Sequence, residues 1–205
     1  MALTRQRIVA EAVALLDSDG LDGVTLRRLA TRLGIQAPTL YWHLPNKAAL
    51  ITAIAELVIE QEFGAPSGPA ADERWQDWMV TFAQRLRRAM LAHPDGARVI
   101  STAQLSLRMA ELSELAMSSL VSQGLTLRRA RLVVLAVEHL TIGFVLEEQA
   151  PHPDLEPVAG HDLATFTERY PTVTAAIADY FQPGVTVDDL FTETVRLIVE
   201  PPHAP

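Results

Sequence analysis

The sequence of 205 residues contains no cysteine, which excludes disulfide frameworks, thiolate catalysis and zinc sites built on cysteine. Glycine is scarce, with 10 residues, and no apolar stretch approaches the roughly 20 residues that span a membrane. The longest aliphatic run, residues 132–137, ends at Glu138. Near the N-terminus, Glu11 and Asp17 interrupt any apolar core of a signal peptide. We therefore expect a soluble, cytoplasmic protein that does not associate with membranes.

Apolar residues are abundant, at 49% of the chain, and they recur at the three- and four-residue spacing of amphipathic helices. No segment shows the strict alternation of a strand, and the sequence has no internal repeat. The sequence therefore predicts an all-α protein. The expected helices cover about 4–18, 26–33, 37–43, 47–62, 72–92, 95–103, 106–122, 126–148, 172–181 and 187–199.

The composition changes at residues 64–70, where glycine, proline and serine replace the helical pattern. This segment predicts a boundary between an N-terminal head, residues 1–63, and a C-terminal body, residues 71–205. A second break at 151–157 is rich in proline and predicts a loop.

The second and third expected helices are separated by a tight turn. Leu26, Leu29 and Leu33 share one face of the second helix, with arginines on the opposite face. Gly34 suits the left-handed conformation that ends a helix, and Pro38 suits the first turn of the next. The pattern predicts a helix-turn-helix whose second helix carries polar and aromatic side chains but no carboxylate, as expected of a helix that enters a DNA groove.

The distribution of charge supports this interpretation. The whole chain has a net charge of −8, yet residues 1–50 hold six basic and four acidic residues, a net charge of +2. A positive head on an acidic protein is typical of an electrostatic footprint for DNA. The alternative is an ordinary helical bundle with a solvated arginine surface and with Tyr41 and Trp42 in its core.

The run from Thr39 to Lys47, TLYWHLPNK, follows a helix that contains Arg-Arg-Leu-Ala. Together they resemble the DNA-binding head of the tetracycline-repressor (TetR) family. The resemblance implies direct contact of five positions with base edges or the groove wall, and Lys47 at a helix N-terminus is expected to bind a phosphate. The candidate DNA-binding residues are Arg27, Arg28, Ala37, Pro38, Thr39, Tyr41, Trp42, His43 and Lys47.

The body resembles the ligand-binding and dimerisation domain of tetracycline repressors at residues 95–97, 124–128 and 139–149. This resemblance implies a homodimer in which the helices at about 126–148 and 187–199 of both subunits form a four-helix bundle. The sequence supports this implication independently. The helix at 126–148 is apolar on more than one face, so it needs more neighbours than one small body supplies.

The family positions that hold a tetracycline–magnesium chelate are mostly apolar in this chain, and they include Phe63. Ile100 stands where the family has a metal-binding imidazole. His139 and Glu147 match polar ligand positions, but eight residues place them about 12 Å apart along a helix. We therefore expect no metal and no cofactor. The resemblance implies a ligand pocket formed by Phe82, Leu86, Ile100, Ala103, Ala116, Val134, His139 and, across the dimer, Glu147.

For His139 two interpretations stay open, namely contact with the ligand or a hydrogen-bonded place in the core. Glu147 equally suits a ligand contact or a plain helix end. The apolar pocket predicts an inducer that is largely apolar, with one or two polar groups.

The sequence thus predicts a ligand-responsive repressor that binds a palindromic operator. A TetR-type activator and a regulator without ligand remain alternatives. A helical enzyme with His139 or His93 as general base lacks the support of a phosphate-binding glycine loop or a Ser-His-Asp signature. A non-specific nucleoid-type binder conflicts with the net charge of −8.

Overall fold

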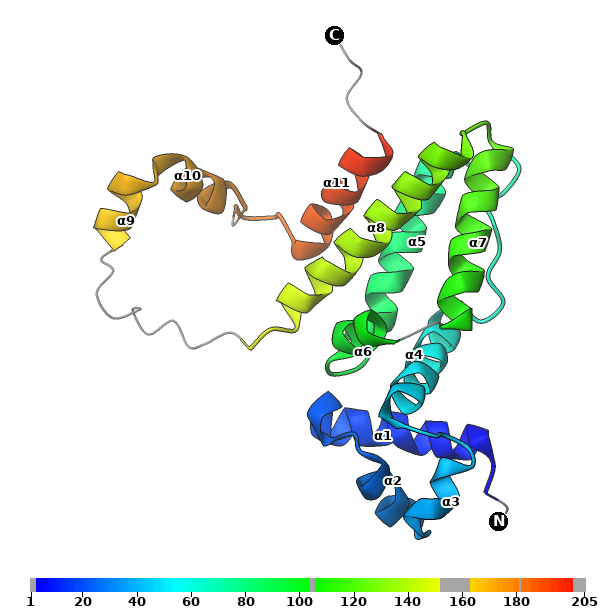
Figure 1. The fold of residues 1–205 in the computed structure, drawn as a ribbon. Helices are drawn as coiled ribbons and strands as arrows, with labels where there is room; N and C mark the ends of the chain where they lie inside the picture. The colour runs from blue at the N-terminus through cyan, green and yellow to red at the C-terminus, as the bar shows by residue number, and fades with distance from the viewer. Residues whose placement is uncertain (1–2, 104–105, 152–162, 181, 201–205) are drawn as a thin grey trace.

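The computed structural model describes residues 3–103, 106–151, 163–180 and 182–200, and within these ranges every regular element is a helix. The head, α1 to α3, lies at one end of the molecule, and α4 leads from it into the body (Figure 1). The all-α prediction is confirmed. The head and its linking helix comprise α1 (Arg5–Gly23), α2 (Leu26–Leu33), α3 (Ala37–Tyr41) and α4 (Lys47–Phe63).

Side-chain caps explain where the head helices begin. The hydroxyls of Thr4 and Thr25 accept hydrogen bonds from backbone N–H groups in the first turns of α1 and α2. Asn46 Oδ1 accepts a hydrogen bond from Ala49 N at 2.8 Å and caps α4. Gly34 ends α2 in the left-handed conformation, with φ at 66°.

Two helix ends in the head differ from the sequence prediction. Gly20 does leave helical geometry, at φ 66° and ψ 177°, but the chain resumes one more turn and α1 ends at Gly23. The recognition helix α3 is shorter than expected, because it ends at Tyr41 rather than at 43. Its N–H groups beyond that point bond in tighter turns, such as His43 N to Leu40 O at 2.9 Å.

The body packs its helices around a shared apolar core. α4 contacts both the head, through α1, and the body, through α5, α6 and α7. Phe191 of α11 is fully buried and lies edge-on to Phe144 of α8, with the ring centroids 5.1 Å apart. The main body helices are α5 (Trp75–Leu91), α6 (Gly96–Thr102), α7 (Leu107–Ser122), α8 (Leu127–Glu148) and α11 (Val187–Val199).

A buried cation joins three of these helices. The guanidinium of Arg87 on α5 lies 2.5 Å from Glu148 Oε1 and 2.6 Å from Asp188 Oδ1. Hydrogen bonding to Glu148 is the main reason why the pKa of Arg87 is raised, and burial acts against it. The bidentate contact fixes the C-terminal end of α8 to α5, and Asp188 extends it to the start of α11.

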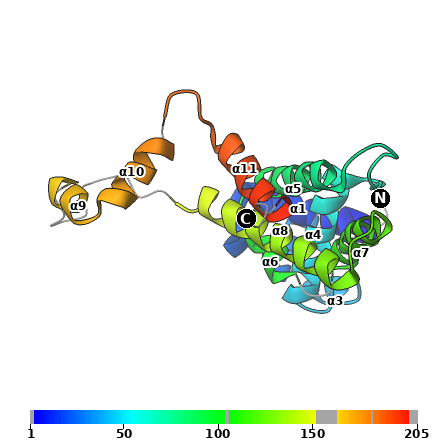
Figure 2. The same ribbon diagram turned by 90° about the horizontal axis from the view of Figure 1, so that it is seen from above.

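Two further helices, α9 (Leu163–Arg169) and α10 (Pro171–Tyr180), extend away from the body (Figures 1 and 2). They pack mainly against each other, and no residue of α10 is buried. The sequence prediction missed α9, because its seven residues carry too short an apolar pattern. Of the predicted loop at 151–157, only Pro151 is described and the rest lies outside the described residues.

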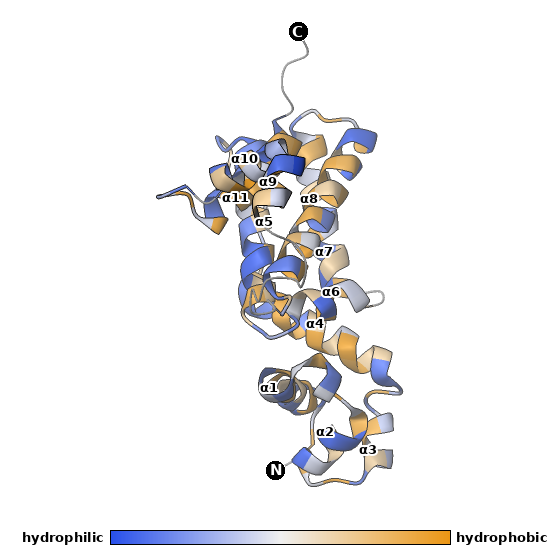
Figure 3. Ribbon diagram, turned by 90° about the vertical axis from the view of Figure 1, so that its left-hand side faces the viewer, coloured by the Kyte–Doolittle hydropathy of each residue, from blue (hydrophilic) through white to orange (hydrophobic). Residues whose placement is uncertain are grey.

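Large apolar side chains remain exposed on α8 and α11 of the single chain. Leu132 of α8 is 49% exposed and Leu197 of α11 is 68% exposed. Figure 3 shows apolar residues recurring along α8. Such side chains next to one another favour a protein interface. Among the described residues, no helix is long and apolar enough to cross a membrane.

Candidate DNA-binding head and ligand cavity

The recognition helix α3 exposes its aromatic side chains. Leu40 is fully buried and anchors α3 in the head core, whereas Tyr41 is 52% exposed and Trp42 is 91% exposed. The alternative that places Tyr41 and Trp42 in a core is therefore wrong. Pro38 and Thr39 are exposed beside them, and Ala37 and His43 are half-buried.

The arginines of α2 do not all have the same role. Arg27 is exposed, and Arg28 forms an ion pair with Asp19 of α1. Arg32 forms an ion pair with Glu11, also on α1. These pairs hold α2 against α1, so a phosphate has to compete with Asp19 for Arg28.

Lys47 is the exposed first residue of α4, directly after the Asn46 cap. A positive side chain thus adjoins backbone N–H groups at a helix N-terminus, an arrangement that attracts phosphate.

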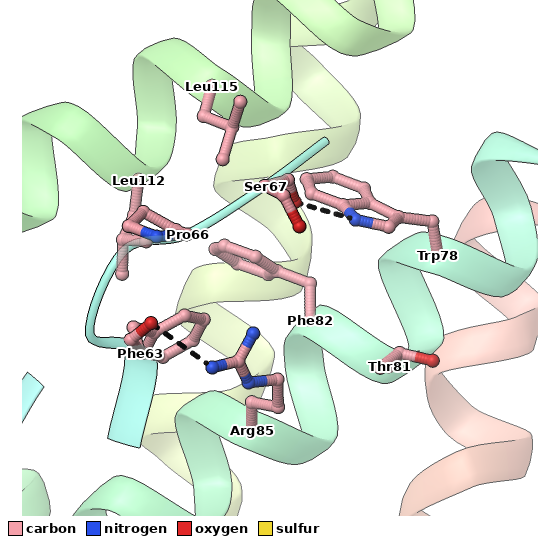
Figure 4. A pocket seen from close by; sticks show the side chains of 9 residues that line it. All are labelled: Phe63, Pro66, Ser67, Trp78, Thr81, Phe82, Arg85, Leu112 and Leu115. Carbon is pink, nitrogen blue, oxygen red and sulfur yellow. Dashed lines mark hydrogen bonds between the residues drawn. The ribbon is translucent and has the colours of Figure 1, made fainter. Parts of the chain in front are cut away.

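In the body, a cavity lies between the C-terminal end of α4, α5 and α7 (Figure 4). Its volume is about 30 Å³, which is enough for an ordered water molecule. A drug-sized ligand needs about 300–1,000 Å³, so the cavity must open to admit one. It is lined by Phe63, Pro66, Ser67, Trp78, Thr81, Phe82, Arg85, Leu112 and Leu115.

Two lining residues that the sequence prediction missed tie this cavity to α4 and to the segment after it. Arg85 donates to Glu62 O at 2.7 Å and to Phe63 O at 3.4 Å, and its guanidinium lies 4.5 Å from the centroid of the Phe63 ring. It therefore binds the carbonyls that the end of α4 leaves without helical partners. Trp78 Nε1 donates to Ser67 O at 3.3 Å (Figure 4).

The structure does not bring all the predicted ligand residues to this cavity, and only Phe82 of the eight lines it. Three of the others lie in the core around it: Leu86, Ala116 and Val134 are fully buried. Ile100 is buried and Ala103 is half-buried on or next to α6.

His139 and Glu147 are both exposed on α8. His139 is therefore not part of the core of the single chain, where the inward-facing residues next to it on α8 are Val137, Glu138 and Thr141. Among the residues that the structure places, no group of three His, Asp or Glu side chains could hold a metal ion.

Glu138 is a buried titratable residue that the sequence prediction overlooked. It is 6% exposed, and its Oε1 accepts a hydrogen bond of 2.6 Å from the Ser113 hydroxyl on α7. Burial raises the pKa of this carboxyl, and the hydrogen bond from Ser113 and the charge of His139 act in the opposite direction.

A polar cluster in the turn between α5 and α6 joins the body to α1. Asp95, at φ 57°, accepts a hydrogen bond of 2.8 Å from Leu21 N, and Arg98 lies 3.0 Å from Asp22. Burial disfavours the charged form of Asp95, but the hydrogen bonds from Leu21 and Arg98 outweigh it and lower the pKa of this carboxyl. The head is thus held by the 93–98 turn as well as by α4.

His93 and Gln149 complete this junction. The buried His93 ring contacts Asp17 of α1 at 2.6 Å and Gln61 of α4 at 3.1 Å. Gln149, at the end of α8, donates to Met90 O and His93 O at 3.1 and 2.8 Å, and it accepts from Ala97 N at 3.1 Å. These hydrogen bonds connect the C-terminal end of α8 to the turn, and His93 connects the turn to α1 of the head.

Comparison with known proteins places both regions in one family. Residues 8–54 match the family model for bacterial regulatory proteins of the tetR family, and residues 68–200 match that for the tetracyclin repressor-like C-terminal domain. The chain is 35% identical to the tetracycline repressor protein class C of Escherichia coli, over 96% of this chain and 89% of that protein.

Solved structures agree over nearly the whole chain. The TetR family protein ActR of Streptomyces coelicolor, in complex with (S)-DNPA, has a TM-score of 0.81 and 26% identity, covering 97% of this chain and 96% of ActR. A TetR variant from Acinetobacter baumannii AYE, in complex with minocycline, has a TM-score of 0.71 and 27% identity, covering 97% and 95%.

Regulators of this family are dimers that bind DNA, and in general they are transcription factors without enzymatic activity. Together with the exposed recognition helix, these matches establish that the chain belongs to the TetR family and is a ligand-responsive, DNA-binding transcriptional repressor.

Proposed function

We propose that two copies of the chain bind a palindromic operator and that a largely apolar small molecule releases them. The observation that carries the proposal is the exposure of Tyr41 and Trp42 on α3, since large aromatic side chains in water serve binding rather than packing. The head, residues 1–63, would bind DNA, and the body, residues 71–205, would bind the ligand and the second subunit. Such a repressor is not an enzyme and acts in the cytoplasm, where the operator lies.

The DNA contacts divide by chemistry. Lys47 and Arg28 would bind phosphates, and Arg27 would reach the groove. Ala37 offers only a methyl group, which suits an apolar contact with thymine. The five residues proposed to meet base edges or the groove wall are Arg27, Ala37, Pro38, Thr39 and Tyr41, and the exposed Trp42 and the half-buried His43 follow them at the end of α3.

The ligand would enter among α5, α6, α7 and α8. Phe82, Leu86, Ile100, Ala103, Ala116 and Val134 would form its apolar surroundings, with His139 and Glu147 completing the site where the second subunit adjoins α8. Because Arg85 binds the carbonyls at the end of α4, opening the cavity would disturb the helix that carries the head. A ligand releases DNA only by as much as it prefers the open conformation.

The proposal is tested by selecting an operator from random DNA with the purified protein and comparing it with random duplex at two salt concentrations. We expect a palindrome with half-site centres about 34–36 Å apart. Selection of DNA without symmetry would contradict the dimeric arrangement.

Induction is tested separately with tetracycline, in Mg²⁺ and in EDTA. Because Ile100 cannot bind a metal, we expect tetracycline to be a poor inducer and any release to be independent of Mg²⁺. Release at low micromolar tetracycline that EDTA abolishes would contradict the proposed apolar, metal-free site.

A further inference from the structure

Glu138 lies where an ordinary core would have an apolar residue. It is the one acidic residue among those described that is buried, and it faces α7 from the middle of α8. Among the described residues, no arginine or lysine forms an ion pair with it, and the titratable neighbour that acts on it is the exposed His139. A buried carboxylate without a cation costs folding free energy. The hydrogen bond to Ser113 does not explain the carboxylate, since a glutamine would keep that bond without the charge.

The Ser113–Glu138 pair adjoins the proposed ligand chamber. Ala116 follows Ser113 by three residues on α7, and Val134 precedes Glu138 by four on α8. Side chains three or four residues apart share a helix face. Ala116 and Val134 are both fully buried, so the carboxyl borders surroundings that are otherwise apolar. An ionisable side chain that burial perturbs, next to a binding chamber, is a candidate for a functional group.

We propose that Glu138 anchors the inducer and that the inducer carries a protonated amine on an apolar frame. This inference rests on the proposed function, because it places the ligand in the body chamber. The ammonium donates a hydrogen bond to the Glu138 carboxylate, and Ser113 holds the carboxylate in place. Charge-assisted hydrogen bonds are about twice as strong as neutral ones. The ligand also supplies the missing counter-charge, so its binding relieves a cost that the empty protein carries.

The test uses a panel of apolar amines, each paired with the alcohol of the same frame, such as 2-naphthylmethylamine and 2-naphthylmethanol. Binding to the full-length protein is measured by calorimetry. The wild type should bind the amines more tightly. Glu138→Gln should weaken amine binding about ten- to a hundredfold and leave alcohol binding nearly unchanged. Glu114→Gln, on the exposed face of α7, is the matched control and should change neither.

Ser113→Ala is a second variant that keeps the carboxylate, and it should retain the preference for amines. Operator binding and circular dichroism show that each variant is folded. Equal binding of amine and alcohol by the wild type, equal loss of both in Glu138→Gln, or no binding of any amine at millimolar concentration would each overturn the assignment.

Operator release is measured separately. Amine binding without release would contradict the proposed induction but not the anchor, and release without a preference for amines would do the reverse.

Discussion

The head exposes its proposed functional residues to solvent, whereas the body buries most of the residues proposed to bind the ligand. In the head, Trp42 is 91% exposed while Leu40, two residues earlier, is fully buried. In the body, Ala116 and Val134 are fully buried and the cavity has a volume of about 30 Å³. The head can therefore meet DNA as it stands, whereas this cavity has to open to admit a drug-sized ligand. A sensor needs that difference, because a ligand that fits both conformations equally shifts nothing.

The largest effect is expected from breaking the dimer, since the head then loses its second half-site. Leu197→Asp places a charge on an α11 side chain that is 68% exposed in the single chain. We expect monomers at micromolar concentration and operator affinity lower by at least about a thousandfold, as expected when one of two half-sites is lost. Sedimentation equilibrium and operator titration measure the two effects. Its neighbour Ile198 is half-buried against the core and suits the test less well.

The matched control is Leu107→Asp on α7. Leu107 is 71% exposed, close to the 68% of Leu197, but it lies outside the proposed interface. It should leave both the dimer and operator binding intact. A dimeric Leu197→Asp protein with full affinity would show that the subunits meet elsewhere.

The second effect concerns the junction through which the body controls the head. Gln149→Leu removes three hydrogen bonds to the turn at residues 90–97. At about 1 kcal/mol each, we expect the free energy of unfolding to fall by about 3 kcal/mol, as measured by urea denaturation. Operator affinity should respond less to inducer in this variant. Gln182→Leu, at an exposed position, should change the unfolding free energy by less than about 0.5 kcal/mol. Unchanged induction in Gln149→Leu would show that the contact of Gln149 with the turn does not carry the signal to the head.

The head could be predicted from sequence because its signals are local. Thr4 and Asn46 cap their helices, and Gly34 ends α2, as their positions in the sequence indicate. The early end of α3 at Tyr41 was missed, because no residue type at positions 42 and 43 indicates the tighter turn that follows the helix.

The body could be predicted only in part because its site depends on contacts between distant helices. In the sequence, Glu138 only ends an apolar run, and the neighbouring His139 matches the family. Consecutive residues of a helix point about 100° apart. Packing against Ser113, 25 residues away, turns Glu138 inward and leaves His139 exposed. Arg85 was missed for the same reason, since its partners Glu62 and Phe63 belong to another helix.

The third effect is the pH dependence of stability that the buried Glu138 causes in the body. The folded protein holds a proton on Glu138 more tightly than the unfolded chain does, because burial raises the pKa above its ordinary value of 4.5. The folded state is therefore favoured at low pH, and this contribution is lost as pH rises through the raised pKa. Glu138→Gln should remove that loss. At pH 7 it should raise the melting temperature by about 2–4 °C for each 1 kcal/mol by which the buried charge lowers the free energy of unfolding. A wild type whose stability relative to this variant stays constant from pH 4 to 8 would contradict the burial argument.

The smallest effect is expected from Lys47 on the surface of the head, through its contribution to DNA affinity. Lys47 is the first residue of α4, where its charge and the free N–H groups of the helix N-terminus favour contact with a phosphate. Lys47→Ala should weaken binding to all duplexes alike and reduce the slope of log affinity against log salt by about 0.9. Lys47→Arg keeps the charge and should keep the slope. Because Lys47 is exposed and caps nothing itself, neither variant should alter the melting temperature. A loss of affinity confined to one base pair of the operator would instead show that Lys47 reads sequence, and the division between phosphate and base contacts in the head would have to be redrawn.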